Sequence, residues 1–348
     1  MSTASGEPQP TQDNEDSGLN AEKAGRSLRN GLISLTILIV MAAGLLLAIP
    51  GLHGVAHEVA HMDSGWLAAA VGLEILSCLG YVVAFLQVFE RAPVRFGARV
   101  ALSELAFGAA VSVGGAGSVA VGMWLLVERG APPVRVAERS AVLFLLTSAI
   151  NVITLVIAGV AGALSGGHSP LLTIVPAAVG ATVFVFFLVL PRYVDRLAAF
   201  RSPGRLHTFL TETAASIRDT KRLLVKPDWR ILGAVGFLWF DIAVLVACFA
   251  ALDNVPPLAS IVLAYQLGYL SNFLPIPGGI GVLDASFVGL LVLYGVNATT
   301  ATAATLVYHA IALWIPAVWG TIAFLILRRS RGEPLSLRDD RQIHRGET

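Results

Sequence analysis

Six long apolar runs constrain this chain more than any other feature of its sequence. They cover residues 32–50, 66–89, 140–163, 171–190, 231–252 and 301–327. About 20 consecutive apolar residues form a helix long enough to cross the hydrocarbon core of a bilayer. The composition agrees, because 55% of the residues are hydrophobic and only 14% are charged, as is typical of membrane proteins. We therefore predict an all-α polytopic membrane protein with six full transmembrane helices.

Two further apolar stretches, 100–127 and 258–295, are interrupted by glycine-rich breaks. Arg and Lys in short loops mark the cytoplasmic side of a membrane protein. Arginines lie on both sides of 100–127, whereas the loops flanking 258–295 carry neither Arg nor Lys. Each stretch is therefore predicted to enter and leave the membrane on one side, as a re-entrant hairpin whose irregular backbone is buried in the protein. The two hairpins point in opposite directions, and both chain termini are predicted to be cytoplasmic.

The transmembrane domain is predicted to cover residues 30–328, between a disordered cytoplasmic tail at 1–29 and a cytoplasmic tail at 329–348. The first of these tails is too polar to bury a core. A basic segment at 191–230 is predicted to be cytoplasmic as well. It fits an interfacial helix against anionic headgroups, or its charges serve only to fix the orientation of the chain. Its apolar residues at helical spacing are Leu206, Leu210, Ile217 and Leu224.

An internal repeat emerges when the sequence is shifted by 164 residues. The shift places 66–89 on 230–253, 100–127 on 264–291 and 140–163 on 304–327. It also places Gly114, Gly115 and Gly117 on Gly278, Gly279 and Gly281. Each half, about 66–163 and 230–327, therefore consists of a span, a hairpin and a span, and the loop charges orient the halves oppositely. Inverted repeats with broken helices are the architecture of alternating-access transporters.

The glycine-rich breaks are candidate substrate contacts. Glycine permits backbone angles closed to other residues, and proline ends a helix. Helix ends at such a break expose backbone amides that favour phosphate groups. The alternative is a tight helix crossing that needs small residues and binds nothing. The candidates are Gly114, Gly115, Gly117, Asn272, Pro275, Pro277, Gly278, Gly279 and Gly281.

Ionisable side chains within the predicted spans are candidates for ion coupling or for contact with a headgroup. Glu74 and Asp241 lie at similar depths in the two halves, Asp284 follows the second break, and His309 lies in the last span. No basic side chain lies deep in a span, which favours coupling to protons or cations. The alternative is that each acid caps a helix or reaches the membrane edge, and we expect this for Glu104.

The segment HEVAH, residues 57–61, is typical of helical zinc sites in metalloproteases. A third ligand would have to come from elsewhere, and the segment is predicted to be a short external loop. We therefore expect no metal and no cofactor, and a membrane metalloenzyme remains a less favoured hypothesis.

Residues 275–285 read P-x-P-G-G-x-G-x-x-D-A. This pattern resembles a signature of the flippase-like membrane family that includes the transmembrane module of lysylphosphatidylglycerol synthases. The similarity covers about 30–330. It implies a polytopic protein that moves or presents a lipid-linked substrate. Asp284 stands where the family usually has Glu. The first break departs further, because Val113 precedes Gly114 and Ser118 replaces an acid. Only about 20 residues follow the last span, so we do not expect the synthase domain of some relatives.

We therefore predict a transporter of the cytoplasmic membrane that moves or presents a phospholipid or polyprenyl-linked lipid and is not an enzyme. Its expected partners are membrane lipids and envelope-biosynthesis enzymes, and the net charge of +1 gives no reason to expect nucleic acid. A phosphate-binding G-x-x-x-x-G-K-[ST] motif is absent from the sequence, so we do not expect direct drive by ATP. The alternative is a non-transporting scaffold subunit for envelope lipid or glycan synthesis.

Overall fold

All regular structure in the described part of the chain is helical. The computed structural model describes Arg29, Ile33 and residues 53–110, 116–165, 169–199, 205–225, 228–269 and 280–330. The first predicted span, 32–50, lies outside these residues except for Ile33, as do most of the two predicted tails. The helices are α2 (His53–Ala60), α3 (Ser64–Val88), α4 (Val94–Ala110), α5 (Ala116–Glu128), α6 (Pro133–Leu164), α7 (Pro170–Ala199), α8 (Arg205–Val225), α9 (Ile231–Ala250), α10 (Leu258–Tyr269), α11 (Ile280–Leu293) and α12 (Ala298–Arg329).

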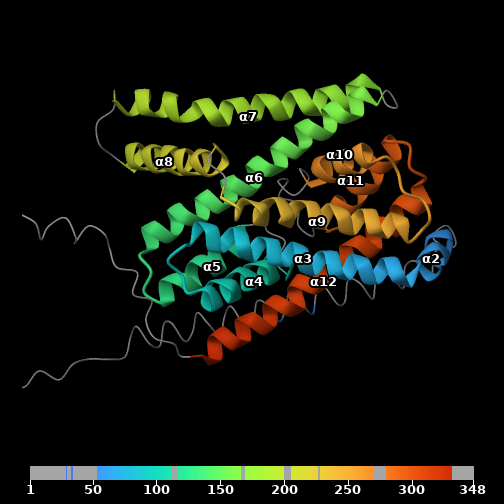
Figure 1. The fold of residues 1–348 in the computed structure, drawn as a ribbon, viewed down its shortest axis with the longest axis horizontal. Helices are drawn as coiled ribbons and strands as arrows, with labels where there is room; N and C mark the ends of the chain where they lie inside the picture. Colours follow the sequence, from blue (N-terminus) through green and yellow to red (C-terminus); the bar gives the residue numbers. More distant parts are fainter. Residues whose placement is uncertain are drawn as a thin grey trace, which may run out of the picture.

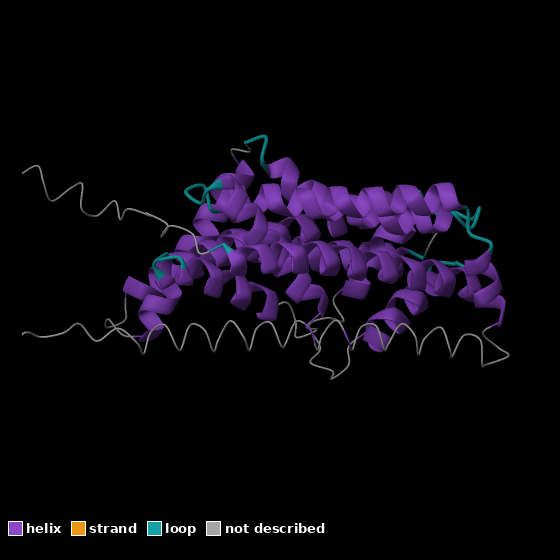
Figure 2. Cartoon of the chain, turned by 90° about the horizontal axis from the view of Figure 1, so that it is seen from below, coloured by secondary structure: helices purple, strands orange, loops and turns teal. Residues whose placement is uncertain are grey.

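Five of these helices are long and apolar enough to cross a membrane by length and composition. They are α3, α6, residues Pro170–Val194 of α7, α9 and α12. These helices account for five of the six predicted spans. Helix α6 begins at Pro133, earlier than the predicted apolar run, because the first turn of a helix tolerates proline. Figure 1 shows α3, α7 and α9 aligned with one another and α6 and α12 running obliquely to them, and Figure 2 shows the same helices from below.

Four shorter helices form two pairs, α4 with α5 and α10 with α11. They contain 17, 13, 12 and 14 residues, so each is at most about 26 Å long at ~1.5 Å per residue. A bilayer core is about 30 Å thick, so a single helix of this kind is too short to cross it. Figure 1 places α4 and α5 toward one end of the long helices and α10 and α11 toward the other.

Helices α3 and α9 cross closely at the centre of the packing. A Cβ atom on Gly80 of α3 would lie 2.6 Å from the backbone nitrogen of Phe237 and 2.8 Å from the carbonyl oxygen of Gly233, both in α9. The Ser77 hydroxyl donates to the Phe237 carbonyl at 2.8 Å. The crossing therefore depends on a residue without a side chain at position 80.

The contacts around this crossing come in matched pairs. Helix α4 packs on α12, and α10 packs on α6. Likewise α5 packs on α6, and α11 packs on α12. Helices α2 and α8 also correspond, because α2 precedes α3 and packs on α12, whereas α8 precedes α9 and packs on α6. These contacts of one half thus have counterparts in the other half, whereas α7, which packs on α6 and α8, has no counterpart among the described helices.

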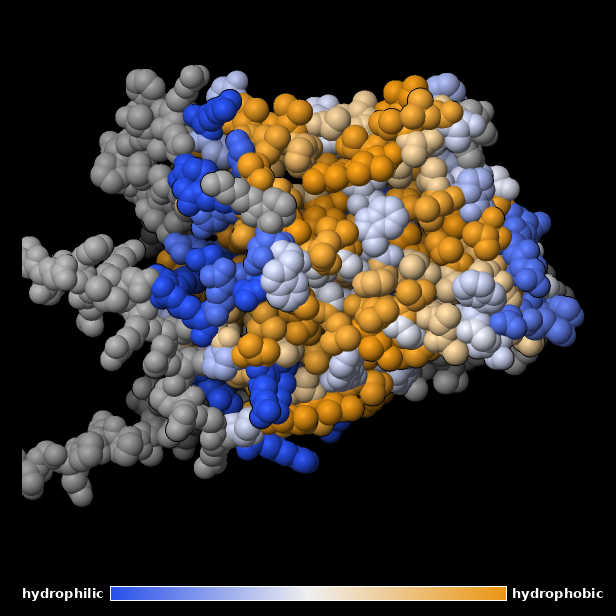
Figure 3. Space-filling view, in the orientation of Figure 1, coloured by the Kyte–Doolittle hydropathy of each residue, from blue (hydrophilic) through white to orange (hydrophobic). Residues whose placement is uncertain are grey.

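Apolar side chains cover the middle of the face shown in Figure 3, and hydrophilic residues gather at its two ends. Large exposed apolar residues of α7 include Phe186 (62% exposed) and Val179 (58%). One end carries arginines, among them Arg91 after α3, Arg139 in the first turns of α6 and Arg329 at the end of α12. An apolar surface of this kind suits lipid contact rather than water.

The prediction of a short loop at HEVAH is wrong, because His53–Ala60 form the eight-residue helix α2. This helix packs against the start of α12. The Thr300 hydroxyl donates to Glu58 Oε1 at 3.3 Å, and a Cβ atom on Gly54 would touch Thr299 at 3.4 Å. The tertiary contact therefore stabilises a helix too short to persist alone in water.

Candidate functional site

Two tyrosines hydrogen bond a buried carboxyl group, Asp241, near the middle of α9. The Tyr308 hydroxyl of α12 donates to both carboxyl oxygens, 3.2 Å from Oδ1 and 3.0 Å from Oδ2. The Tyr265 hydroxyl of α10 donates to Oδ2. Asp241 is 9% exposed, and both tyrosines are buried. A buried acid is far less costly when donors satisfy it, so three helices cooperate to hold this carboxyl group inside the protein.

Glu74 of α3 faces Asp241 where α3 and α9 cross. The two carboxyl groups lie close enough to interact directly. Cys78 Sγ, one turn further along α3, lies 3.7 Å from Glu74 Oε1 and donates a weak hydrogen bond to it. Glu74 Oε2 is buried without a hydrogen-bond partner among the described residues. Two adjacent desolvated carboxylates repel each other, and a shared proton removes one of the charges. The pair is therefore suited to exchange a proton or to receive a cation.

Further aromatic rings pack against the two tyrosines that hold Asp241. Phe287 of α11 lies with its ring centroid 5.7 Å from Tyr265, 6.1 Å from Tyr308 and 5.4 Å from His309. A Cβ atom on Gly268 of α10 would lie 2.5 Å from the Phe287 ring. The absence of a side chain at Gly268 thus lets the Phe287 ring of α11 approach α10 closely.

The structure brings together three of the sequence-predicted residues, Glu74, Asp241 and His309. His309 lies near enough to Asp241 for an electrostatic interaction. Asp284 lies early in α11, but its side chain is outside the described residues. Gly117 and Gly281 lie in the first turns of α5 and α11. The remaining predicted substrate contacts lie outside the described residues: Gly114, Gly115, Asn272, Pro275, Pro277, Gly278 and Gly279.

Tyr265 is a site residue that the sequence reasoning missed. A buried tyrosine usually finds a hydrogen-bond partner for its hydroxyl, so a tyrosine inside a predicted apolar hairpin indicates a polar group nearby. The same signal applies to Tyr81 in the second span. Other buried polar atoms near the ring cluster are Gln266 Nε2 and Thr305 Oγ1, which have no hydrogen-bond partner among the described residues.

The expectation that Glu104 reaches the membrane edge is wrong. Glu104 is 3% exposed, and its Oε2 accepts a hydrogen bond from the Tyr81 hydroxyl at 2.7 Å. Helix α4 packs against α3, α5 and α12, so this face of α4 points into the protein rather than toward headgroups. Glu104 is therefore a second buried acid, separate from the pair at the crossing.

His57 of α2 contacts His61, which directly follows the helix. The rings of His57 and His61 stack with centroids 4.1 Å apart, and His61 Nδ1 donates to the His57 carbonyl at 2.8 Å. Within the described residues, no group of three or more His, Cys, Asp or Glu side chains is placed to hold a metal ion. The described part of this segment therefore gives no support to a zinc site.

This chain is similar to a known membrane protein over a short stretch, and a protein family matches it over most of its length. A stretch of 91 residues is 32% identical to a UPF0104 membrane protein of Methanothermobacter thermautotrophicus. The match covers 26% of this chain and 26% of that protein, so the chain spans about a quarter of the relative it matches. The family described as the lysylphosphatidylglycerol synthase TM region matches over residues 31–320. This match confirms the resemblance noted from the motif at 275–285, and the chain belongs to that family.

Proposed function

We propose that this protein is a lipid transporter of the cytoplasmic membrane, not an enzyme, and that it moves a phospholipid or a polyprenyl-linked lipid. The observation that carries the proposal is the buried pair Glu74–Asp241 at the crossing of α3 and α9. Acids inside transmembrane segments are costly to bury and mark ion or substrate pathways. Family membership supports a membrane role related to lipids.

The matched helix contacts support an inverted repeat that works by alternating access. The two short-helix pairs lie toward opposite ends of the long helices (Figure 1). Helices α5 and α11 begin at Ala116 and Ile280, positions related by the 164-residue shift. In this proposal the two pairs are re-entrant hairpins, and the arginine-rich end faces the cytoplasm. Rocking of one half against the other would expose the centre to each side in turn.

The substrate phosphate is proposed to bind at the glycine-rich breaks. The breaks directly precede the N-termini of α5 and α11, and free amides at a helix N-terminus favour anions. The acidic pair would then couple this binding to an ion. A proton or cation at Glu74 and Asp241 relieves their repulsion, so the charge of the pair can alter the packing of α3 against α9.

Replacing the acids by their amides tests this role directly. Asp241→Asn keeps an oxygen that accepts from Tyr265 and Tyr308, and Glu74→Gln keeps the side-chain shape, so both variants should fold. The assay follows loss of a headgroup-labelled phospholipid from one leaflet of vesicles that contain the purified protein. We expect each variant to slow translocation by about tenfold or more.

Asp253→Asn serves as the matched control. Asp253 is exposed in the turn after α9 and has a φ of 51°, which asparagine adopts readily, so this variant should transport at the normal rate. Normal translocation by folded Asp241→Asn and Glu74→Gln proteins would remove the acidic pair from the mechanism. If the unaltered protein also moved the phospholipid no faster than protein-free vesicles do, the scaffold alternative would be favoured.

A further inference from the structure

A polar pocket lies at the arginine-rich end of the molecule, away from the acidic pair. Its volume is about 360 Å³. Three segments line it: the end of α3 with the turn that follows, the connection from α5 into α6, and α8. Val88 in its lining and Glu74 at the crossing are both on α3, about 20 Å apart along the helix at ~1.5 Å per residue. The pocket is therefore a site distinct from the central one.

The lining combines an apolar floor with a charged rim. The floor consists of buried side chains, including Val88, Leu126, Val136 and Val142. The charged residues of the rim are three arginines and three acids: Arg91, Arg135, Arg139, Glu90, Glu138 and Asp219. Its volume falls within the range of small-molecule sites, about 300–1,000 Å³. The side chains thus suit a ligand with an apolar part and with charges of both signs.

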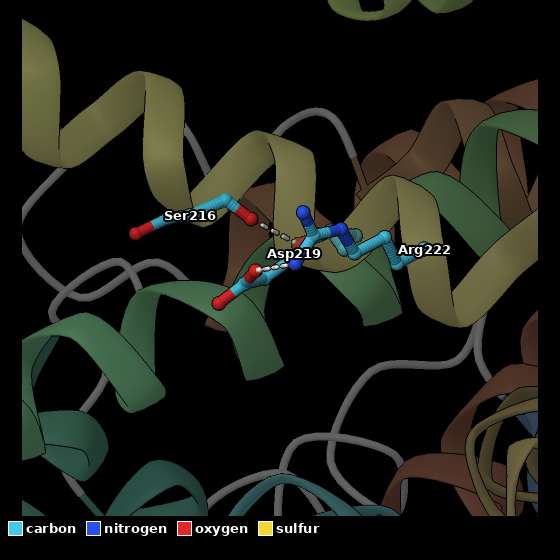
Figure 4. A network of polar contacts seen from close by, with 4 residues as sticks. Ser216, Asp219 and Arg222 are labelled. Carbon is cyan, nitrogen blue, oxygen red and sulfur yellow. Dashed lines mark hydrogen bonds and ion pairs between the residues drawn. The ribbon is translucent and has the colours of Figure 1, made fainter.

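The wall formed by α8 is fixed in place, while its charged side chains stay accessible. Helix α8 packs on α6 and α7. The buried Thr220 hydroxyl donates to the Ser216 carbonyl at 2.8 Å. Asp219 of α8 pairs with Arg222 (Figure 4) at 3.7 Å, and the two side chains are 45% and 82% exposed. Such an exposed pair contributes about 0–1 kcal/mol, so Asp219 can take another partner at little cost.

The location of the pocket and the charges on its rim favour a lipid headgroup as the ligand. It lies at the arginine-rich end of the long helices, and the ends of helices that cross a bilayer core meet the headgroup region. Basic pockets between transmembrane helices bind lipid headgroups. The planar guanidinium group of arginine can donate two parallel hydrogen bonds to one phosphate. The rim acids are acceptors for a cationic amine. A headgroup that is only anionic would place its phosphate next to these carboxylates, and the like charges would repel each other.

We propose that this pocket binds the headgroup of a zwitterionic phospholipid that carries a primary amine. Arg135 and Arg139 hold the phosphate, Glu138 and Asp219 accept hydrogen bonds from the ammonium group, and the glycerol and first methylenes cover the apolar floor. A quaternary ammonium group cannot donate these hydrogen bonds, so phosphatidylcholine binds less well than phosphatidylethanolamine. This site does not depend on the proposed transport and would bind lipid even in a protein that moves none.

Binding of short-chain lipids to the purified full-length protein tests the proposal. The probes are dihexanoyl forms of phosphatidylethanolamine, phosphatidylcholine and phosphatidylglycerol, together with inorganic phosphate, and the readout is the shift in unfolding temperature with ligand concentration. We expect the ethanolamine lipid to bind best. The double variant Arg135→Gln/Arg139→Gln should weaken that binding by about tenfold or more, as loss of charge-assisted hydrogen bonds predicts.

Arg95→Gln is the matched control, because Arg95 is exposed at the same end of the molecule and does not line the pocket. This variant should bind the ethanolamine lipid normally. Unweakened binding by the double variant would overturn the proposal, as would a preference for phosphatidylglycerol or phosphatidylcholine. Inorganic phosphate that binds as tightly as the lipid would identify an anion site rather than a lipid site. If the double variant does not fold, Glu138→Gln takes its place. We expect this variant to bind phosphatidylethanolamine no more tightly than phosphatidylcholine.

Discussion

Glu104 shows how a single glycine can hold a buried acid in place. Its carboxyl group lies against Gly122 of α5, where a Cβ atom would be only 1.5 Å from Oε1. The same carboxyl group accepts the Tyr81 hydroxyl, so the glycine, the acid and the tyrosine form one unit that joins α3, α4 and α5. Neither the acid nor its donor can move without leaving a buried polar group unpaired, which is costly.

We predict that Gly122→Ala destabilises the protein, because the added methyl group would push Glu104 away from Tyr81. The expected loss is about 1–3 kcal/mol, the usual cost of overpacking. Gly289→Ala is the control, since a Cβ atom at Gly289 meets no atom within 4 Å, and alanine favours the helix. Thermal unfolding in detergent measures both variants. An unchanged midpoint for Gly122→Ala would show that Glu104 is not held as described.

At the scale of elements, the crossing of α3 and α9 brings the two acids together. The atoms that confront Gly80 belong to the backbone of α9, and backbone cannot move aside as a flexible side chain can. Small residues at such crossings let helices in membranes approach closely. The separation of Glu74 from Asp241 therefore depends on the packing of residues at least four positions away from either acid along the chain.

We predict that Gly80→Ala moves α3 from α9 and impairs both stability and transport. The expected destabilisation is about 2 kcal/mol or more, at the upper end for overpacking against a rigid neighbour. Gly72→Ala on the same helix is the control, because a Cβ atom there meets no atom within 4 Å. The unfolding midpoint and the vesicle assay provide the two readouts. A Gly80→Ala protein as stable as Gly72→Ala would contradict the close crossing.

At the scale of the whole molecule, the distribution of charge predicts how the protein lies in the membrane. Cys78 and Cys248 are both buried, so an impermeant thiol reagent should report mainly on cysteines introduced at exposed positions. We expect Arg91→Cys and Arg139→Cys to react only after the cells are opened, because arginine-rich ends face the cytoplasm. Asn254→Cys, in the exposed turn after α9, should react in intact cells.

This labelling experiment also tests the hairpin formed by α4 and α5. If this pair re-enters the membrane, Arg91 and Arg139 lie on the same side. Labelling of the two positions from opposite sides would mean that the segment between them crosses the membrane, and the inverted repeat would fail. The result does not depend on transport activity, so it tests the architecture alone.

Much of the architecture follows from the sequence because its signals are local. A run of about 20 apolar residues forms a helix wherever it meets lipid, so five predicted spans are found in the described residues. The glycine-rich breaks likewise separate α4 from α5 and α10 from α11. The depth of Glu74 and Asp241 could be counted along their spans, because the rise of a helix is constant.

Contacts between distant segments were decided only by the tertiary structure. Asp241 takes its hydrogen bonds from tyrosines 24 and 67 residues away, and no local pattern names such partners. The burial of Glu104 and the helix α2 were missed for the same reason, since each depends on a neighbouring helix. Hydrophobicity along the chain thus determined which segments enter the membrane. Close packing at Gly80, Gly122 and Gly268 decided which side chains meet there, because it fixes how helices approach and turn.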